Sequence, residues 1–212
     1  MKIEEVKNLA LEGVCSITYK RFHDHRGYFT EVMRKSDLDS VENGTIFKGL
    51  EFLQANESFS LAGTMRGLHF QWDPFMGKLI RTISGRMIDM VMDIRRDSTN
   101  FGKIILFDMP STSDDENGVW LWVPVGFAHG NFFTQDTTIE YFCTGSYNPE
   151  GEAGISPLSP DIDWSLCDPL LREEFVKITQ SEGLLMSDKD KEGYSLKSWM
   201  ETAESAKFVL KI

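Results

Sequence analysis

The chain contains four histidines, and these are the first candidates for acid–base chemistry near neutral pH. His23 and His25 lie in a polar stretch whose composition is typical of a turn. His69 and His129 instead lie in segments with the composition of strands, and the mouth of a β-barrel is a common place for a ligand site. His69 and His129 are therefore the stronger candidates for a functional role.

A metal site is one alternative for these histidines, because imidazole and carboxylate groups are common metal ligands. Many small β-barrels bind a metal through a His-x-His pair, but His69 is followed by Phe70 and Gln71. The segment His23-Asp24-His25 has that spacing, and no further ligand is obviously paired with it. We therefore expect no metal.

Proton transfer in a pocket that also holds cations fits the remaining residue types better. A neutral imidazole can accept a proton near pH 7, and an aspartate on its other ring nitrogen would stabilise the imidazolium. A lysine beside a carbonyl group would stabilise an enolate, and a tyrosine could return the proton from the opposite face. The candidates of these types are His69, Lys78, Tyr141, and either Asp89 or Asp190.

Three common catalytic motifs are missing from the sequence. It contains neither a GxGxxG nor a GxxxxGK[ST] element, so no dinucleotide-binding fold and no P-loop is indicated. The GxSxG elbow of a Ser-His-Asp hydrolase is absent as well.

The elements that must hold these residues are mostly strands. Ile88, Met90, Met92 and Ile94 alternate with other residues and so share one face. Further short runs rich in β-branched or aromatic residues, separated by Gly, Pro, Asn, Asp and Ser, are Lys103 to Met109, Val119 to Val123, Phe127 to Phe133 and Thr138 to Cys143. Such a series predicts an all-β protein, an antiparallel sandwich or barrel, and most specifically a jelly-roll barrel with short helices.

Helical signals are confined to the regions outside these strands. The segment Ser36 to Ser40 can begin a short helix, and Asp168 to Thr179 has apolar residues at helical spacing. A terminal helix is predicted over Ser195 to Ala206, with Trp199 as its anchor. We expect residues 1–165 to form the barrel and residues 166–212 to be a C-terminal extension that packs on it.

The 212 residues carry a formal net charge of −11, with 22 Lys+Arg and 33 Asp+Glu. This charge argues against a protein that coats nucleic acid or an anionic membrane. No secretory signal and no apolar run of transmembrane length is visible. Three widely spaced cysteines suit a reducing compartment, so a cytoplasmic location is expected.

Taken together, the motifs resemble those of the dTDP-4-dehydrorhamnose 3,5-epimerase family of nucleotide-sugar epimerases. The matching segments run in family order across about residues 20–190: Phe22 to Glu31, Gln54 to Ser58, Arg66 to Gln71, Gly77 to Arg81, Asp89 to Arg95, Ser98 to Gly102, Trp122 to Gly130, Tyr141, Tyr147 to Pro149, Glu152 and Met186 to Asp190. The resemblance implies a cupin-like jelly-roll barrel that forms homodimers, and it implies neither a metal nor a redox cofactor.

The resemblance also implies a role for each matching residue. His69 would be the base that removes the proton at C3 or C5 of a 4-keto sugar, Lys78 would face the enolate, and Tyr141 would reprotonate the other face. Asp190 would orient His69. Contacts to the nucleotide sugar would come from Gln54, Asn56, Arg66, His129, Glu152 and Lys189, with Tyr147 stacked on the base and Arg26 and Glu31 reaching the base across the dimer. If Arg66 and His69 line one pocket, Gly67 must mark a bend, because residues three apart in a regular strand face opposite ways.

The sequence leaves several functions open. The principal reading is epimerisation at C3, at C5 or at both, on a 4-keto-6-deoxy sugar carried by dTDP, with other nucleotides as an alternative. A 3,4-ketoisomerase and a non-catalytic nucleotide-sugar binding module are the two further alternatives. The proposed ligand is an anionic diphosphate, so the pocket is expected to be locally positive despite the overall charge of −11.

Overall fold

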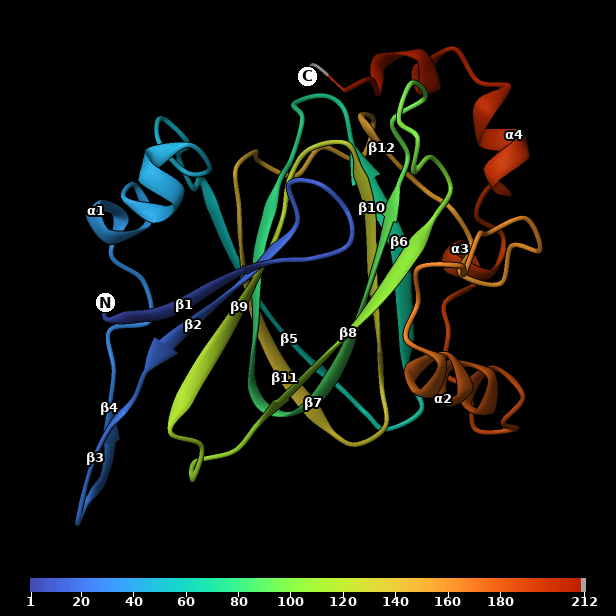
Figure 1. The fold of residues 1–212 in the computed structure, drawn as a ribbon. Helices are drawn as coiled ribbons and strands as arrows, with labels where there is room; N and C mark the ends of the chain where they lie inside the picture. The colour runs from blue at the N-terminus through green and yellow to red at the C-terminus, as the bar shows by residue number, and fades with distance from the viewer. Residues whose placement is uncertain (211–212) are drawn as a thin grey trace.

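β-Strands are the main regular elements of the computed structural model, which describes residues 1–210 (Figure 1). The last two residues of the expected C-terminal extension, 211 and 212, lie outside the described part. The strands are β1 (Ile3–Asn8), β2 (Cys15–Lys20), β3 (Phe22–Asp24), β4 (Gly27–Phe29), β5 (Gln54–Ser60), β6 (Met65–Gln71), β7 (Lys78–Asp93), β8 (Ile104–Ser111), β9 (Asn117–Val123), β10 (Phe127–Phe133), β11 (Thr137–Cys143) and β12 (Glu152–Gly154).

Ten of these strands form two antiparallel layers that share the long strand β7. One layer has the order β1-β2-β9-β7-β11-β5, and β7 contributes its first half, residues 78–84, to it. The other layer has the order β8-β7-β10-β6-β12, and β7 contributes its second half, residues 85–93, to it. We call them the β5 layer and the β12 layer. This arrangement confirms the predicted all-β jelly-roll barrel.

Gly85 marks the point at which β7 passes from one layer to the other. Its φ is +96°, a conformation that side chains strongly disfavour. A Cβ at this position would also lie 2.5 Å from the carbonyl oxygen of Asp136. Only glycine therefore allows one continuous strand to serve both layers at this crossing.

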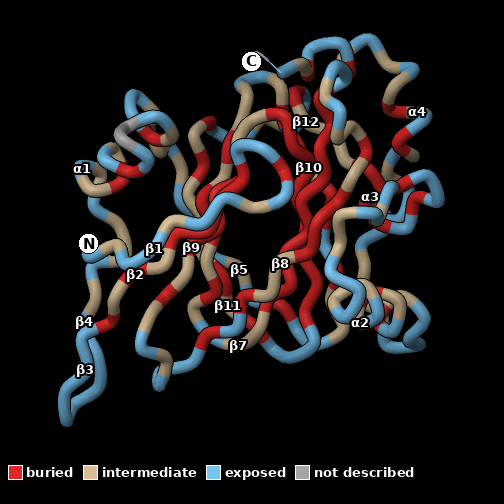
Figure 2. The backbone as a smooth tube through the Cα atoms, viewed as in Figure 1, coloured by how far each residue is buried: buried red, intermediate tan, exposed pale blue. Residues whose placement is uncertain are grey.

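The core lies between the layers and beneath the C-terminal helices (Figure 2). Ile88, Met90 and Met92 are buried in one cluster, as their alternation in the sequence predicts. Phe175 and Trp199, from the C-terminal helices, belong to the same cluster. The helical region therefore packs on the β12 layer through shared apolar contacts.

The helices of the described residues are short: α1 (Lys35–Leu38), η1 (Val41–Gly44), α2 (Pro169–Thr179), α3 (Asp188–Lys191), α4 (Leu196–Met200) and η2 (Glu204–Lys207). The predicted helix over 168–179 is confirmed as α2, and the Asp168 carboxylate caps it by accepting hydrogen bonds from two backbone amides of its first turn. The single terminal helix predicted over 195–206 is wrong in extent. It is broken after Met200, and η2 follows as a separate turn.

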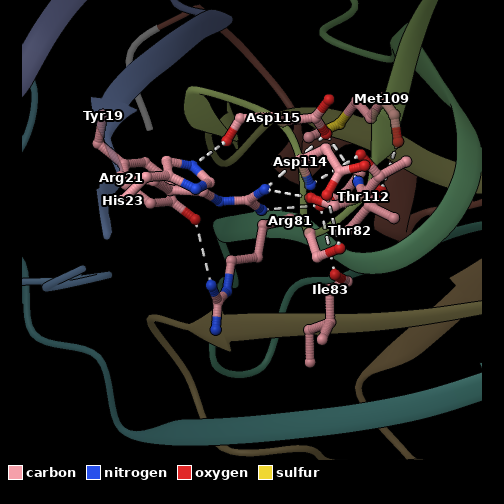
Figure 3. A network of polar contacts seen from close by, with 12 residues as sticks. Tyr19, Arg21, His23, Arg81, Thr82, Ile83, Met109, Thr112, Asp114 and Asp115 are labelled. Carbon is pink, nitrogen blue, oxygen red and sulfur yellow. Dashed lines mark hydrogen bonds and ion pairs between the residues drawn. The ribbon is translucent and has the colours of Figure 1, made fainter. Parts of the chain in front are cut away.

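Strands β3 and β4 form a hairpin that projects from the barrel (Figures 1 and 2). A polar network ties the start of this hairpin to the turn after β8 (Figure 3). In it, the Arg21 guanidinium donates to Ser111 Oγ over 2.9 Å, and His23 Nε2 contacts the carbonyl oxygen of Asp115 at 3.0 Å. The aromatic side chains of the hairpin nevertheless remain largely exposed to solvent: Phe22, Tyr28 and Phe29 are 50%, 42% and 68% exposed.

None of the helices within residues 1–210 combines the length and the apolar character needed to cross a lipid bilayer.

Candidate active site

Two cavities between the layers meet at the same three side chains: His69, Lys78 and Tyr141 line both. The first, of about 330 Å³, also contains Gln54, Asn56, Tyr147 and Glu152, and we call it the Tyr147 cavity. The second, of about 200 Å³, also contains Arg66, His129, Asn131 and Asp190, and we call it the His129 cavity. His69 comes from the β12 layer, whereas Lys78 and Tyr141 come from the β5 layer.

His69 and Asp190 form a hydrogen-bonded pair, with 2.6 Å between Nε2 and Oδ1. Asp190 is buried, whereas the His69 side chain is 31% exposed and so remains accessible from the cavity. Burial alone would raise the pKa of Asp190, but the hydrogen bonds from His69 and Ser187 outweigh it and lower that pKa. Asp190 is therefore an anion that can orient the imidazole and stabilise its protonated form.

Two local features bring Asp190 and His69 together. Ser187 caps the short helix α3 by accepting a hydrogen bond from the Asp190 amide, which fixes the start of this turn beside β6. On the other side, Gly67 has a φ of +107° and breaks the regular alternation of β6, as predicted. As a result Arg66 and His69, three residues apart, line the same cavity.

A second histidine–aspartate pair lies in the His129 cavity. His129 Nε2 is 2.7 Å from Asp89 Oδ2, and both residues are buried. Burial lowers the pKa of His129 and raises that of Asp89, although each residue favours the charged form of the other. The two aspartates that the sequence leaves as alternatives thus each have a histidine of their own.

Lys78 is the cation that lies among these groups. Burial lowers its pKa, while Cys143, Asp89 and Glu152 act in the opposite direction. Within residues 1–210 its ammonium group forms no ion pair, so it is available to a ligand. Its place at the start of β7, opposite Cys143 of β11, positions it at the junction of the two cavities.

Tyr141 stands on β11, in the layer opposite His69. Burial raises the pKa of its phenol, with a further contribution from Cys143, while Arg66 acts in the opposite direction. The phenol therefore keeps its proton at neutral pH and can serve as a proton donor.

Three polar side chains are linked at the Tyr147 cavity. The Tyr147 hydroxyl donates to Glu152 Oε1 over 2.8 Å, and the Lys189 ammonium pairs with the same carboxylate oxygen. The Tyr147 amide donates to Gln54 Oε1 over 2.8 Å, and Gln54 donates to Asn56. These contacts join β5, β12 and α3 around one opening.

Arg66 has no carboxylate partner in the described chain. Its guanidinium donates to Ser60 Oγ over 3.0 Å and to the carbonyl oxygen of Phe59 over 3.4 Å. These neutral partners leave its charge uncompensated, so Arg66 and Lys78 are the cations of the two cavities that an anionic ligand can meet.

Arg26 and Glu31 are the expected site residues that line none of the cavities around His69, whereas Lys189 lines two further openings beside Asp190 rather than the Tyr147 or the His129 cavity. Arg26 lies at the turn of the β3–β4 hairpin, with its side chain 78% exposed and paired with Asp24 at 2.7 Å. Glu31 pairs with Arg34 and with the amino group of Met1. The structure thus brings eleven of the thirteen expected residues together around His69 and leaves these two outside.

Sequence reasoning missed several residues that line the cavities, namely Ser58, Met76, Asn131, Ile139 and Cys143. Asn131 follows two residues after His129, so strand alternation from His129 could have placed it on the same side of β10. Cys143 could have been found in the same way, two residues after Tyr141. Met76 precedes β7, and no signal in the sequence marks it.

No group of three or more His, Cys, Asp or Glu side chains in the part of the chain that the structure describes is arranged to hold a metal ion.

The chain is similar in sequence to a known protein family over most of its length. The family model described as dTDP-4-dehydrorhamnose 3,5-epimerase matches residues 8–198. A dTDP-4-dehydrorhamnose 3,5-epimerase of Sinorhizobium fredii is 37% identical over 194 residues, which cover 90% of this chain and 88% of that protein.

Solved structures agree with the sequence comparison. The dTDP-6-deoxy-D-glucose-3,5-epimerase of Legionella pneumophila, in complex with dTDP-4-keto-L-rhamnose, aligns with a TM-score of 0.78 and 29% identity over 95% of this chain and 96% of that one. A 3'-monoepimerase from Streptomyces bikiniensis, in complex with dTDP-quinovose, aligns with a TM-score of 0.74 and 25% identity over 92% and 89% of the two chains.

Proposed function

The chain belongs to the dTDP-4-dehydrorhamnose 3,5-epimerase family, and we propose that this isomerase inverts C3 and C5 of a dTDP-linked 4-keto-6-deoxy hexose. The observation that carries the proposal is the placement of His69 and Tyr141 in opposite layers around shared cavities. A base and an acid on opposite sides of a sugar ring can remove a proton from one face and return one to the other.

The reaction begins with the C4 ketone, which makes the protons on its neighbouring carbons acidic. His69 takes the proton from C3 or C5, and Asp190 stabilises the imidazolium that forms. The negative charge moves to the C4 oxygen, where the Lys78 ammonium stabilises the enolate. Tyr141 then donates its proton to the same carbon from the other face, and the configuration is inverted.

The other expected site residues are assigned to the binding of the nucleotide sugar. Arg66 and Lys189 contact the diphosphate, while Gln54, Asn56, His129 and Glu152 bind the sugar and its phosphate. Tyr147, which is 54% exposed, stacks on the base. Residues 166–212 act as an extension of the barrel that supplies Lys189 and Asp190.

A homodimer accounts for Arg26 and Glu31, the expected residues that line none of the cavities around His69. The β3–β4 hairpin carries three exposed aromatic side chains, a surface that suits contact with a second copy of the chain. Arg26 and Glu31 of one subunit then reach the base that the other subunit binds. A cytoplasmic location agrees with the three free cysteines.

Deuterium exchange tests the function directly. The protein is given dTDP-4-keto-6-deoxyglucose in D2O, and the protons at C3 and C5 are followed by NMR. We expect deuterium at both carbons of the product, and we expect His69→Ala to lower the rate on the order of 10²–10⁴-fold. No uptake at either carbon with the wild-type protein would overturn the proposal.

The same experiment separates the alternatives. Uptake at C3 alone or C5 alone identifies a single-centre epimerase, the activity named for the Streptomyces bikiniensis neighbour. Movement of the ketone from C4 to C3, seen as new carbon shifts, identifies a 3,4-ketoisomerase. Binding of the nucleotide sugar without any exchange identifies a non-catalytic module.

A further inference from the structure

Asn131 is a buried amide in the His129 cavity that the proposed proton-transfer steps do not use. It lies on β10, is 5% exposed, and lines the same cavity as His69, Lys78 and Tyr141. Its side-chain oxygen is fully buried and has no hydrogen-bond partner within residues 1–210.

A buried amide oxygen without a hydrogen-bond donor lowers the stability of the folded protein, unless a ligand or a water molecule supplies the donor. Gln71 provides the contrast, because it is buried to the same extent on the neighbouring strand β6. Its amide nitrogen donates to the carbonyl oxygens of Pro74 and Ser146, and its oxygen accepts from the Asn148 amide. Gln71, which lines the Tyr147 cavity, thus has its amide hydrogen bonds completed by the protein itself, whereas the side-chain oxygen of Asn131 in the His129 cavity has no partner in the described residues.

The surroundings of Asn131 also favour a polar ligand group. Asn131 stands opposite Asp89 in the register of β10 and β7, and the second carboxylate oxygen of Asp89 is likewise buried without a partner in the described residues. Ser58 from the β5 layer lines the same cavity. Polar groups from both layers therefore gather beside the three residues assigned to the chemistry.

We propose that Asn131 is a specificity-determining residue whose amide forms a hydrogen bond with a hydroxyl group on the hexose ring, at C2 or C3. This inference rests on the proposed function, because the hexose occupies the His129 cavity only if His69 and Tyr141 act on it. A site built to bond a hydroxyl rejects an analogue that lacks it, since the amide is then left without a partner.

Ligand binding tests the inference without requiring turnover. Isothermal titration measures the Kd of dTDP, of dTDP-6-deoxyglucose, and of its 2-deoxy and 3-deoxy analogues. The wild-type protein is expected to bind at least one of these analogues about tenfold more weakly than dTDP-6-deoxyglucose. In Asn131→Leu this difference is expected to disappear, while the Kd of dTDP stays within about twofold.

Asn117→Leu is the matched control. Asn117 also has a buried side-chain oxygen without a partner in the described chain, but it lies on β9 and lines neither cavity. The control variant is expected to discriminate as the wild type does. Asn131→Val, which suits a strand, replaces the leucine variant if circular dichroism shows that the latter does not fold.

Two outcomes would overturn the inference. One is full discrimination by the Asn131 variants, which would mean that the amide holds only water. The other is an equal loss of affinity for dTDP and for dTDP-6-deoxyglucose, which would place its effect on the nucleotide or on the fold. Absence of deuterium exchange with intact discrimination would instead contradict the proposed function alone.

Discussion

The two histidine–aspartate pairs of the site have the same composition and different surroundings. His69 is 31% exposed and borders every cavity around it, whereas His129 is 8% exposed and burial lowers its pKa. A base must reach the carbon acid and must be able to carry a proton, and only the first pair combines access with an anionic partner whose pKa is lowered. The second pair is better suited to present a neutral imidazole to the substrate.

Replacement of Asp190 tests this division of roles. In Asp190→Asn the imidazolium of His69 loses its anionic partner, so kcat is expected to fall by about 10²-fold or more while KM changes little. Steady-state kinetics on the 4-keto substrate provide the measurement. Asp188→Asn is the control, because Asp188 lies on the same short helix with its side chain 89% exposed. Equal effects of both substitutions would contradict an electrostatic role for Asp190.

The pH dependence of the reaction tests Lys78. Because burial lowers its pKa, the ammonium is lost at a lower pH than in an ordinary lysine, and kcat/KM is expected to decline on the alkaline side at that point. Tyr141 does not set this limb, since burial raises its pKa. In Lys78→Arg the guanidinium stays protonated, so the decline is expected to move to higher pH, with a lower maximum rate. An unchanged alkaline limb in the arginine variant would assign it to another group.

At the scale of elements, the bend in β6 decides whether Arg66 and His69 share a cavity. The bend depends on the close approach of β6 and β10: a Cβ on Gly67 would lie 2.5 Å from the Cα of Gly130 and 2.8 Å from the carbonyl oxygen of His129. This contact lies where the pairing of β6 with β10 shifts its register, between the pair His69–His129 and the pair Arg66–Asn131. One glycine therefore serves the positions of both histidines.

Gly67→Ala is expected to lower the free energy of unfolding by about 2–4 kcal/mol and to abolish most of the activity. The stability is measured by urea denaturation and the activity by deuterium exchange. Gly49→Ala is the control, because Gly49 has a φ of +82° but open space around its Cβ position, so it bears only the backbone cost of about 1 kcal/mol. Similar losses for both variants would mean that the approach of the strands is unimportant.

Some of the strands and helices could be predicted from the sequence, and others could not. Phe127 to Phe133 coincides with β10, because its aromatic-rich run is bounded by turn residues on both sides. The long strand β7 was predicted only from Ile88, because its first half changes layer at Gly85 and its alternation does not continue through that point. The break between α4 and η2 falls at residues 201–203, where neither a proline nor a glycine marks it in the sequence.

The site, too, could be predicted from the sequence only in part. The His69 and Asp190 motifs lie 121 residues apart, and no local pattern relates them. Their pairing came from resemblance to a family, whereas spacing alone left Asp89 and Asp190 as equal alternatives. Asn131 escaped notice because its importance lies in an unsatisfied oxygen, a property that exists only in the folded chain.

At the scale of the whole molecule, the net charge of −11 does not describe the two cavities, where Arg66 and Lys78 stand beside Glu152 and Asp190. Arg66 and Lys78 face the cavities without carboxylate partners in the described chain, while acidic residues such as Asp114 and Asp115 lie in exposed turns. Among the cations assigned to the site, Arg26 on the projecting hairpin is the one that lines none of the cavities around His69 in the described residues. In the proposed dimer, Arg26 of one subunit reaches the base that the other subunit binds.

Subunit complementation tests that arrangement. The Arg26→Ala and His69→Ala variants are each expected to be impaired, since each lacks one part of every site. In a mixture of the two, unfolded and refolded together, each heterodimer combines the intact His69 of one subunit with the intact Arg26 of the other. Half of the dimers are heterodimers and half of their sites are complete, so about a quarter of wild-type activity is expected.

The choice of control follows from the geometry of the site. His69 and Asp190 lie on the same chain and pair with each other, so a refolded mixture of His69→Ala with Asp190→Asn contains no complete site and is expected to recover nothing. Recovery in the first mixture and none in the second can arise only if Arg26 acts across the subunit boundary. If neither mixture recovers although the mixed dimers form, Arg26 serves its own chain or none, and the exposed hairpin needs another partner.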